Sequence, residues 1–258
     1  MDGFIEPSLF TPAVAAPAPA RAADWLVPQR WDSYSPAEHA TWLTLVDRQT
    51  ERLQGRACGA FLDGLHALDL RGDGIPDFVA LSDRLEALTG WRIVPVEGLV
   101  PDEVFVQLLA RRQFPAGRFI RPPHQLDYIE APDVFHDVFG HVPMLTDPAF
   151  ADFMQAYGEA GVRAAETGAL EPLARLYWFT VEFGLLQGPA GPSLYGAGLA
   201  SSPAECVHAL ESSDVERRPF GLAEVTATPF RTDVMQPLYF VIESFEALLA
   251  LADEGFRA

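Results

Sequence analysis

Two histidines and one glutamate are the residues of this chain best suited to chemistry. His136 and His141 lie in the run His-Asp-Val-Phe-Gly-His-Val-Pro, and Glu182 stands among aromatic and aliphatic residues between Tyr177 and Phe183. Two imidazoles and a carboxylate form a common ligand set for a divalent metal, and three protein ligands leave coordination positions open for chemistry. The sequence therefore predicts a metal site made by His136, His141 and Glu182.

The spacing of the two histidines places a condition on the local structure. On a continuous α-helix a residue five positions along is turned by about 140°, so two such side chains do not face one ion. Asp133 after Pro132 is a good N-cap, and Gly140 is expected to end the short helix that begins there. We therefore expect the helix to stop between His136 and His141, which lets both converge on one ion.

The surroundings of Glu182 point to a cation independently of the histidines. Residues 173–186 are apolar on nearly every side, which predicts a helix that is buried all round. An unpaired carboxylate in such a helix would cost roughly several kcal/mol. Arg175, the nearest basic residue in the sequence, lies two turns away, too far for a local ion pair. A metal ion bound by neutral imidazoles would compensate the carboxylate.

Each of these residues also has an ordinary structural explanation. Taken singly, either histidine fits a hydrogen-bonded structural role, and Glu182 could pair with a distant arginine; together they favour a metal site. This ligand set suits both zinc and iron, but the His-Glu-x-x-His motif of zinc peptidases is absent from the sequence, which favours Fe(II). A zinc hydrolase and a metal-stabilised binding protein without turnover stay as alternatives.

Composition excludes several other classes of function. The 36 acidic residues against 18 basic ones give a net charge of −18, which argues against nucleic acid and anionic membranes as partners. All basic residues are arginines, so Schiff-base lysine chemistry and a P-loop lysine are excluded. Cys58 and Cys206 stand far apart, and the sequence contains no run of about 20 apolar residues. We expect a cytoplasmic protein in a reducing compartment.

Local signals predict a mainly α fold with a few short β-strands. Helices are expected to begin after capping residues or prolines near residues 35, 77, 101, 147, 171 and 202, with a last helix over residues 236–254. Strands are expected at residues 91–96, 118–121 and 224–228. Because there is no βαβ rhythm and no repeat, we predict one mainly α domain at residues 25–258, preceded by a flexible tail at residues 1–24.

Three longer runs bear a family resemblance. Residues 132–143, residues 177–184 and the run Tyr-Gly-Ala-Gly-Leu at 195–199 resemble the pterin-dependent aromatic amino acid hydroxylases, most closely the bacterial phenylalanine 4-monooxygenases. The later run Gln-Pro-Leu-Tyr-Phe-Val-Ile-Glu-Ser-Phe at 236–245 agrees with this, and the resemblance extends from about residue 25 to the C-terminus.

The resemblance implies a chemistry and its cofactors. It implies conversion of phenylalanine to tyrosine with O2, non-haem Fe(II) and tetrahydrobiopterin or a related tetrahydropterin, with tryptophan and tyrosine hydroxylases of the same family as alternatives. It implies His136, His141 and Glu182 as the iron ligands. The regulatory domain and the tetramerisation helix of the mammalian members have no counterpart in the sequence, so we expect a monomer.

The resemblance also implies binding residues. Arg121 would receive the substrate carboxylate, and Asp133 would hold Arg121 in place. The rest of the amino acid pocket would be Tyr177, Trp178, Phe183 and Ser201, and the pterin would meet Gly98, Leu99, Val100 and Phe105. Asp137 and Ile129 stand where mammalian members carry glutamate and threonine, so contacts around these two positions are not carried over.

Overall fold

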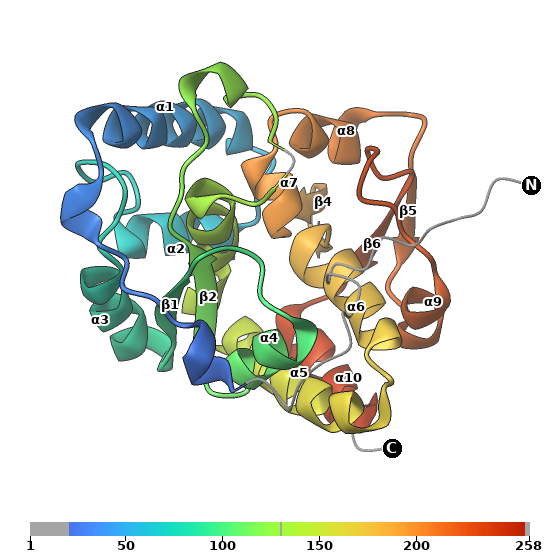
Figure 1. Cartoon of the computed structure of the whole chain (residues 1–258). Coiled ribbons are helices and arrows are strands. Elements are labelled where there is room, and N and C mark those ends of the chain that lie inside the picture. Colours follow the sequence, from blue (N-terminus) through green and yellow to red (C-terminus); the bar gives the residue numbers. More distant parts are fainter. Residues whose placement is uncertain (1–20, 130, 256–258) are drawn as a thin grey trace, which may run out of the picture.

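Helices dominate the computed structural model, which describes residues 21–129 and 131–255 (Figure 1). The helices are α1 (Pro36–Leu53), α2 (Gly59–Leu68), α3 (Phe78–Thr89), α4 (Asp102–Leu109), α5 (Pro148–Thr167), α6 (Glu171–Tyr177), α7 (Ala197–Ser201), α8 (Glu205–Glu211), α9 (Leu222–Ala227) and α10 (Phe245–Gly255). The predicted mainly α fold is confirmed. None of these helices is both long and apolar enough to cross a membrane, within the residues described.

The N-terminal boundary differs from the predicted one at its last residues. Residues 1–20 of the expected tail lie outside the described residues. Ala22–Trp25 forms one 3-10 turn, and Ala22 is buried against Val96 and Val104. The packed part of the chain therefore begins at least three residues before the predicted boundary at residue 25.

Local side-chain chemistry starts the long helices where the sequence predicts. Ser35 and Glu38 form a capping box at α1, in which the Ser35 hydroxyl accepts from the Glu38 N–H and the Glu38 carboxylate accepts from the Ser35 N–H. Asp77 accepts from the N–H of Val79 at α3, and Asp147 caps α5 in the same way. These caps satisfy N–H groups that have no partner inside the helix.

The first sheet is a βαβ unit that the sequence pattern did not reveal. β1 (Arg92–Val96) and β2 (Gln113–Gly117) pair in parallel, and α4 connects them. The strand predicted at residues 118–121 was wrong, because the extended segment lies at 113–117. Pro115 lies within this strand, and a proline is tolerated there because each strand of a two-stranded sheet has a free edge.

The second sheet has the strand order β4-β3-β6-β5. β3 (Leu185–Gly188) and β4 (Gly191–Leu194) form a hairpin, while β6 (Leu238–Ile242) runs parallel to both β3 and β5 (Glu216–Pro219). Two predictions were wrong here, because residues 236–254 divide into β6 and α10, and residues 224–228 lie mostly in α9. A short apolar run buried on both faces does not reveal from its pattern whether it is strand or helix.

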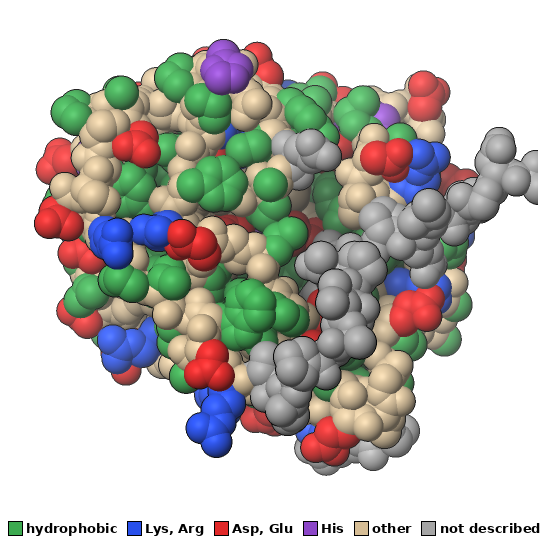
Figure 2. All heavy atoms as spheres, viewed as in Figure 1, with side chains coloured by type: hydrophobic (Ala, Val, Ile, Leu, Met, Phe, Trp, Pro, Cys, Tyr) green, Lys and Arg blue, Asp and Glu red, His purple; other side chains and the backbone are tan. Residues whose placement is uncertain are grey.

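Charged side chains on the surface largely form local pairs. In the face shown in Figure 2 the basic side chains are scattered, and several lie beside acidic ones. Exposed pairs include Arg71 with Asp47 and Arg118 with Glu97. Each such pair contributes little to stability, but it prevents the arginines from forming one positive field.

The packing of α4 on α5 affects the position of Tyr177, whose ring lies deeper in the molecule. A Cβ atom at Gly158 of α5 would lie 2.3 Å from the backbone nitrogen of Ala110, at the end of α4. The neighbouring Tyr157 places its ring 5.5 Å from that of Tyr177. Glycine therefore permits the close approach of α4 and α5 behind Tyr177.

Gly158→Ala is expected to lower the free energy of unfolding by about 1–3 kcal/mol, because the added methyl group meets backbone that cannot rotate away. Urea unfolding measures the change. The matched control is Gly59→Ala at the start of α2, where no atom lies within 4 Å of an added Cβ, and its stability should stay equal or rise slightly. Equal stability of the two variants would contradict the packing argument.

Candidate metal centre

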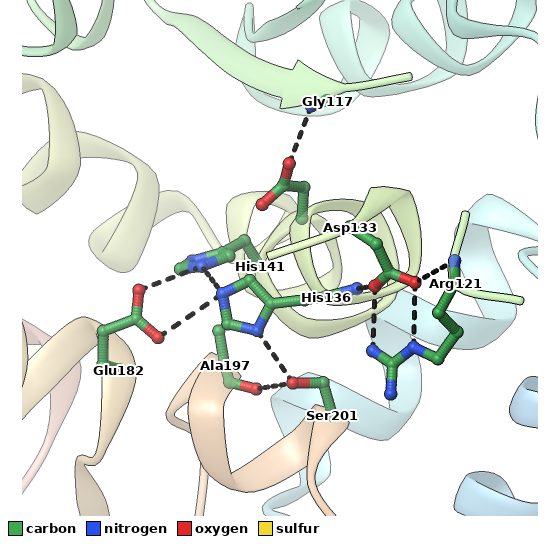
Figure 3. A network of polar contacts seen from close by, with 9 residues as sticks. Gly117, Arg121, Asp133, His136, His141, Glu182, Ala197 and Ser201 are labelled. Carbon is green, nitrogen blue, oxygen red and sulfur yellow. Dashed lines mark hydrogen bonds and ion pairs between the residues drawn. The ribbon is translucent and has the colours of Figure 1, made fainter. Parts of the chain in front are cut away.

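The two histidines lie on one face of a widened helix. His136 and His141 belong to a π-helix, η4 (Phe135–His141), in which His141 is the last residue (Figure 3). In a π-helix the hydrogen bonds join residues five apart, so two residues at this offset stand nearly above one another. The predicted stop at Gly140 was therefore wrong, because the helix widens and continues through both histidines.

Gly140 and Asp133 have clear roles in this segment. A Cβ atom at Gly140 would lie 3.0 Å from the carbonyl oxygen of Ala197, so glycine lets α7 pack against the π-helix. Asp133 accepts a hydrogen bond from the N–H of His136 at 3.1 Å, which confirms the capping expected from the sequence. The first histidine is thus fixed at the start of the segment.

The glutamate lies on a second widened helix. α6 passes into the π-helix η6 (Trp178–Glu182), so the helix predicted for residues 173–186 ends at Glu182, before β3 begins. The Glu182 side chain is buried, with 8% of the residue exposed. Arg175 forms an ion pair with Glu171 on its own helix.

The three candidate ligands converge on one point. The Nε2 atoms of His136 and His141 lie 3.1 Å apart, and the Glu182 carboxylate lies 3.2 Å from His141 Nε2 and 3.7 Å from His136 Nε2. Within the described residues this is the one group of three or more histidine, cysteine or acidic side chains gathered closely enough to hold a metal. Neighbouring ligands about 2.1 Å from a shared ion stand about 3 Å apart.

A serine fixes which nitrogen of His136 is free. Ser201 donates its hydroxyl proton to the carbonyl oxygen of Ala197 at 2.8 Å, and its Oγ lies 2.9 Å from His136 Nδ1. Because the hydroxyl has only one proton, Nδ1 must carry the hydrogen and donate it to Ser201. His136 Nε2 therefore presents its lone pair to His141 and Glu182, the state needed for a metal ligand.

Burial controls the charges around this point. It lowers the pKa of His136 to about 4, so the imidazole is neutral at pH 7. Burial opposes ionisation of Glu182, but the facing imidazoles and the N–H of Gly198 keep the pKa of its carboxyl below the usual value. Burial also raises the pKa of Asp137 to about 7, although its carboxylate accepts from the N–H of Gly117 at 2.7 Å.

This donor set fits a divalent cation. The His136 and His141 Nε2 atoms are only 3.1 Å apart, and two lone pairs at that distance repel unless a cation or a proton lies between them. Glu182 supplies the negative charge, and His141 Nδ1 is buried with no hydrogen-bond partner in the described part of the chain. Two imidazoles and one carboxylate on one side are the ligand type of non-haem Fe(II) sites.

A cavity of about 450 Å³ opens on the three ligands. Of the thirteen residues predicted for the site, Asp133 alone does not line this cavity, because it is fully buried behind Arg121. The lining includes the predicted residues His136, His141, Glu182, Arg121, Tyr177, Trp178, Phe183, Ser201, Gly98, Leu99, Val100 and Phe105. Residues predicted for metal, amino acid and pterin thus share one space.

Arg121 is held in a two-pronged ion pair. Its Nε and Nη2 donate to the two carboxylate oxygens of Asp133 at 2.8 Å, and its backbone N–H adds a third bond at 2.9 Å. Arg121 is only 4% exposed, and its guanidinium lies 5.4 Å from the ring centre of Phe135. The remaining nitrogen, Nη1, has no partner among the described residues and is available to a ligand carboxylate.

The βαβ unit and the segments that follow its strands also line the cavity. Gly98, Leu99 and Val100 follow β1, Arg121 follows β2, and Phe105 projects from α4. The region beyond the carboxyl ends of parallel strands is where such sheets commonly bind ligands. The Phe105 ring meets that of Tyr177 edge to face at 5.4 Å.

Several residues at the site were not predicted. The further cavity lining comprises Val96, Phe114, Pro115, Asp127, Tyr128, Ile129, Pro132, Asp137, Gly198, Ser202, Pro203 and Thr232. Phe114 and Pro115 belong to β2, which was misplaced in the sequence, and Asp137 follows a predicted ligand directly. Behind the lining, Gln236 hydrogen-bonds Trp178, and no local signal in the sequence marks it.

Known proteins are similar to this chain in fold and sequence. Residues 28–252 match the family described as biopterin-dependent aromatic amino acid hydroxylase. A phenylalanine-4-hydroxylase of Caulobacter vibrioides is 54% identical over 242 residues, which cover 94% of this chain and 82% of that protein. Phenylalanine hydroxylase of Chromobacterium violaceum with bound oxidised Fe(III) is 51% identical, with a TM-score of 0.88 over 91% of this chain and 85% of that one.

A second Chromobacterium violaceum structure holds both iron(III) and the oxidised cofactor 7,8-dihydrobiopterin. It is 51% identical, with a TM-score of 0.86, and the match covers 90% of this chain and 85% of that one. The chain therefore belongs to the biopterin-dependent aromatic amino acid hydroxylases. It is a pterin-dependent monooxygenase by family, as the sequence motifs predicted.

Removing a ligand should abolish tight metal binding. In titrations with Fe(II) under anaerobic conditions, His136→Ala, His141→Ala and Glu182→Ala should each weaken binding by more than about 100-fold, because each removes a donor atom. Ser201→Ala, which only releases the orientation of His136, should weaken it by about 10- to 100-fold. The exposed His124 provides the matched control, and His124→Ala should bind like the parent. Parent-like affinity in the ligand variants would refute the site.

Proposed function

We propose that this protein converts L-phenylalanine to L-tyrosine with O2 and a tetrahydropterin at an Fe(II) held by His136, His141 and Glu182. The observation that carries the proposal is the meeting of two imidazoles and a carboxylate with a guanidinium and an aromatic wall in one cavity. The phenylalanine hydroxylases among its relatives support this substrate. Family membership decides against the zinc hydrolase and the binding protein without turnover.

Arg121 is the proposed anchor of the amino acid. A planar guanidinium matches a carboxylate, and Asp133 holds Arg121 so that little freedom is lost when the ligand binds. With the carboxylate fixed at Arg121, the side chain of the amino acid can extend toward the metal ligands. This anchoring turns an encounter between ring and metal into a defined geometry.

The aromatic wall is proposed to hold the substrate ring. Trp178 and Phe183 lie against each other with ring centres 4.5 Å apart, and both line the cavity. Tyr177 lies beside them and is buried. Such surfaces bind an aromatic ring through apolar contact and displace water from the space around the metal ligands.

The loop after β1 is proposed to receive the pterin. Gly98, Leu99 and Val100 offer backbone groups at the cavity edge, and Phe105 offers an aromatic ring close to Tyr177. When both are bound, the reduced pterin would supply the two electrons, and the iron would provide the place at which one oxygen atom of O2 enters the substrate ring and the other is reduced. The protein's own residues bind and orient the metal, the pterin and the amino acid, and no side chain is proposed as a general acid or base.

The metal in this proposal is iron, and its two histidine ligands need to be neutral imidazoles. The hydrogen bond to Ser201 and the burial that lowers its pKa keep His136 in that form at neutral pH.

A monomeric state and a cytoplasmic location stay predictions from the sequence.

Turnover provides the direct test. Purified protein with Fe(II), tetrahydropterin and phenylalanine should form tyrosine and consume O2 in equal amounts, and the zinc-loaded protein should do neither, because zinc does not change its oxidation state. Bound iron without tyrosine formation would refute the proposal. Competition among phenylalanine, tyrosine and tryptophan then decides the preferred ring, which we expect to be phenylalanine.

Arg121→Lys should raise the KM for phenylalanine by about 10- to 100-fold, the equivalent of one charge-assisted hydrogen bond of about 1.5–3 kcal/mol. The KM for the pterin should change little, because Arg121 is assigned to the amino acid alone. Arg71→Lys is the matched control, since Arg71 forms a similar but exposed pair with Asp47. An unchanged KM for phenylalanine would remove Arg121 from the pocket.

A further inference from the structure

The indole of Trp178 is fixed from behind the cavity. Its Nε1 donates to Oε1 of Gln236 at 3.0 Å in a fully buried contact. On its flank, Trp178 stacks on Phe230 with ring centres 4.4 Å apart and planes inclined by 16°. Parallel stacking permits one ring to slide over the other, whereas a hydrogen bond in the ring plane does not. The bond to Gln236 is therefore the contact that fixes the position of the indole within its plane.

The Gln236 side chain has only one orientation available. Its Nε2 donates to the carbonyl oxygens of Arg231 at 2.8 Å and Val234 at 3.0 Å, so both amide protons are used. A flipped amide would set its NH2 group against the indole N–H and its oxygen against two carbonyls. Gln236 is 2% exposed, so water does not replace these bonds. The Oε1 acceptor is thus aimed at Trp178.

The backbone of Gln236 is held by a second buried residue. Glu205, at the start of α8, accepts from the Gln236 N–H at 2.8 Å and from the hydroxyl of Tyr239 at 2.7 Å. On the other side, the Gln236 carbonyl oxygen lies 3.2 Å from His208 Nε2. Glu205 is 6% exposed and Tyr239 is fully buried, so this anchor is shielded from solvent.

We propose that Gln236, anchored by Glu205, is a positioning residue that sets where the Trp178 indole stands and hence which aromatic ring the cavity accepts. Neither residue lines the cavity, so both act through Trp178. The selectivity part of this inference rests on the proposed function. The contact itself does not.

A double-mutant cycle tests the selectivity part. Gln236→Leu should raise the KM for phenylalanine by about three- to tenfold, the factor that corresponds to one neutral hydrogen bond, and should lower the preference for phenylalanine over tryptophan. In a Trp178→Phe background, which has no indole N–H, the same change should leave KM and preference nearly unaltered. Equal factors in both backgrounds would overturn the proposal, because Gln236 would then act elsewhere.

Glu205 offers a second pair of variants in case Gln236→Leu does not fold. Glu205→Gln keeps an acceptor for Gln236 and Tyr239 and should retain the parent KM and preference. Glu205→Ala removes the anchor and should reproduce the loss of preference. A parent-like preference in Glu205→Ala would overturn the role of Glu205.

The contact can be observed without turnover. The chain has five tryptophans, and in the zinc-loaded protein the indole N–H resonance that Trp178→Phe removes belongs to Trp178. Gln236→Leu should shift this resonance upfield. The control Gln155→Leu, whose side chain bonds Arg112 and is not part of the cavity lining, should leave it in place. An unmoved resonance in Gln236→Leu would overturn the proposal. A parent that makes no tyrosine would overturn the proposed function, and the resonance would still decide the contact.

Discussion

One fully buried carboxylate, that of Asp133, fixes the geometry on which the rest of the site depends. An ionised carboxylate removed from water needs a complete set of donors, and Asp133 receives them from the Arg121 guanidinium, the Arg121 N–H and the N–H of His136. The same oxygens therefore bind both Arg121, the proposed anchor of an amino acid carboxylate, and His136, a candidate metal ligand. One side chain sets the span between the two, and under the proposed function this span determines how deep a bound amino acid reaches toward the metal.

Both ligand-bearing segments are π-helical, and this has a geometric reason. Hydrogen bonds between residues five apart bring His136 and His141 to one face, which a regular α-helix would separate by about 140°. Such widened segments are rare and are found mostly at functional sites. At Glu182 the widening also ends a helix whose next residues turn into β3. The local backbone thus takes the arrangement that brings the candidate ligands together.

These features explain which parts could be predicted from the sequence. Helix starts depend on neighbours within three residues, as at Ser35 and Asp147, so they were found. The ligands were found because a lone Glu182 in an apolar run is costly wherever the backbone goes. The π-helices were also missed. The pairing of β1 with β2 and the strand β6 were missed because each depends on partners distant in sequence. Arg121 was assigned from the family resemblance alone, since an arginine gives no sign in the sequence that it is buried.

The cavity has a supported side and an exposed side, and the difference follows from the polar contacts behind its lining. His136 is held by Ser201, Arg121 by Asp133 and Trp178 by Gln236, each through a buried or part-buried hydrogen bond from another segment of the chain. Leu99 and Tyr128 also line the cavity, but they are 61% and 71% exposed. Side chains with such exposure retain rotational freedom that the held groups have lost. The candidate metal ligands and Arg121, the proposed amino acid anchor, therefore lie on the side that polar contacts hold, and Leu99 and Tyr128 lie on the side that faces solvent.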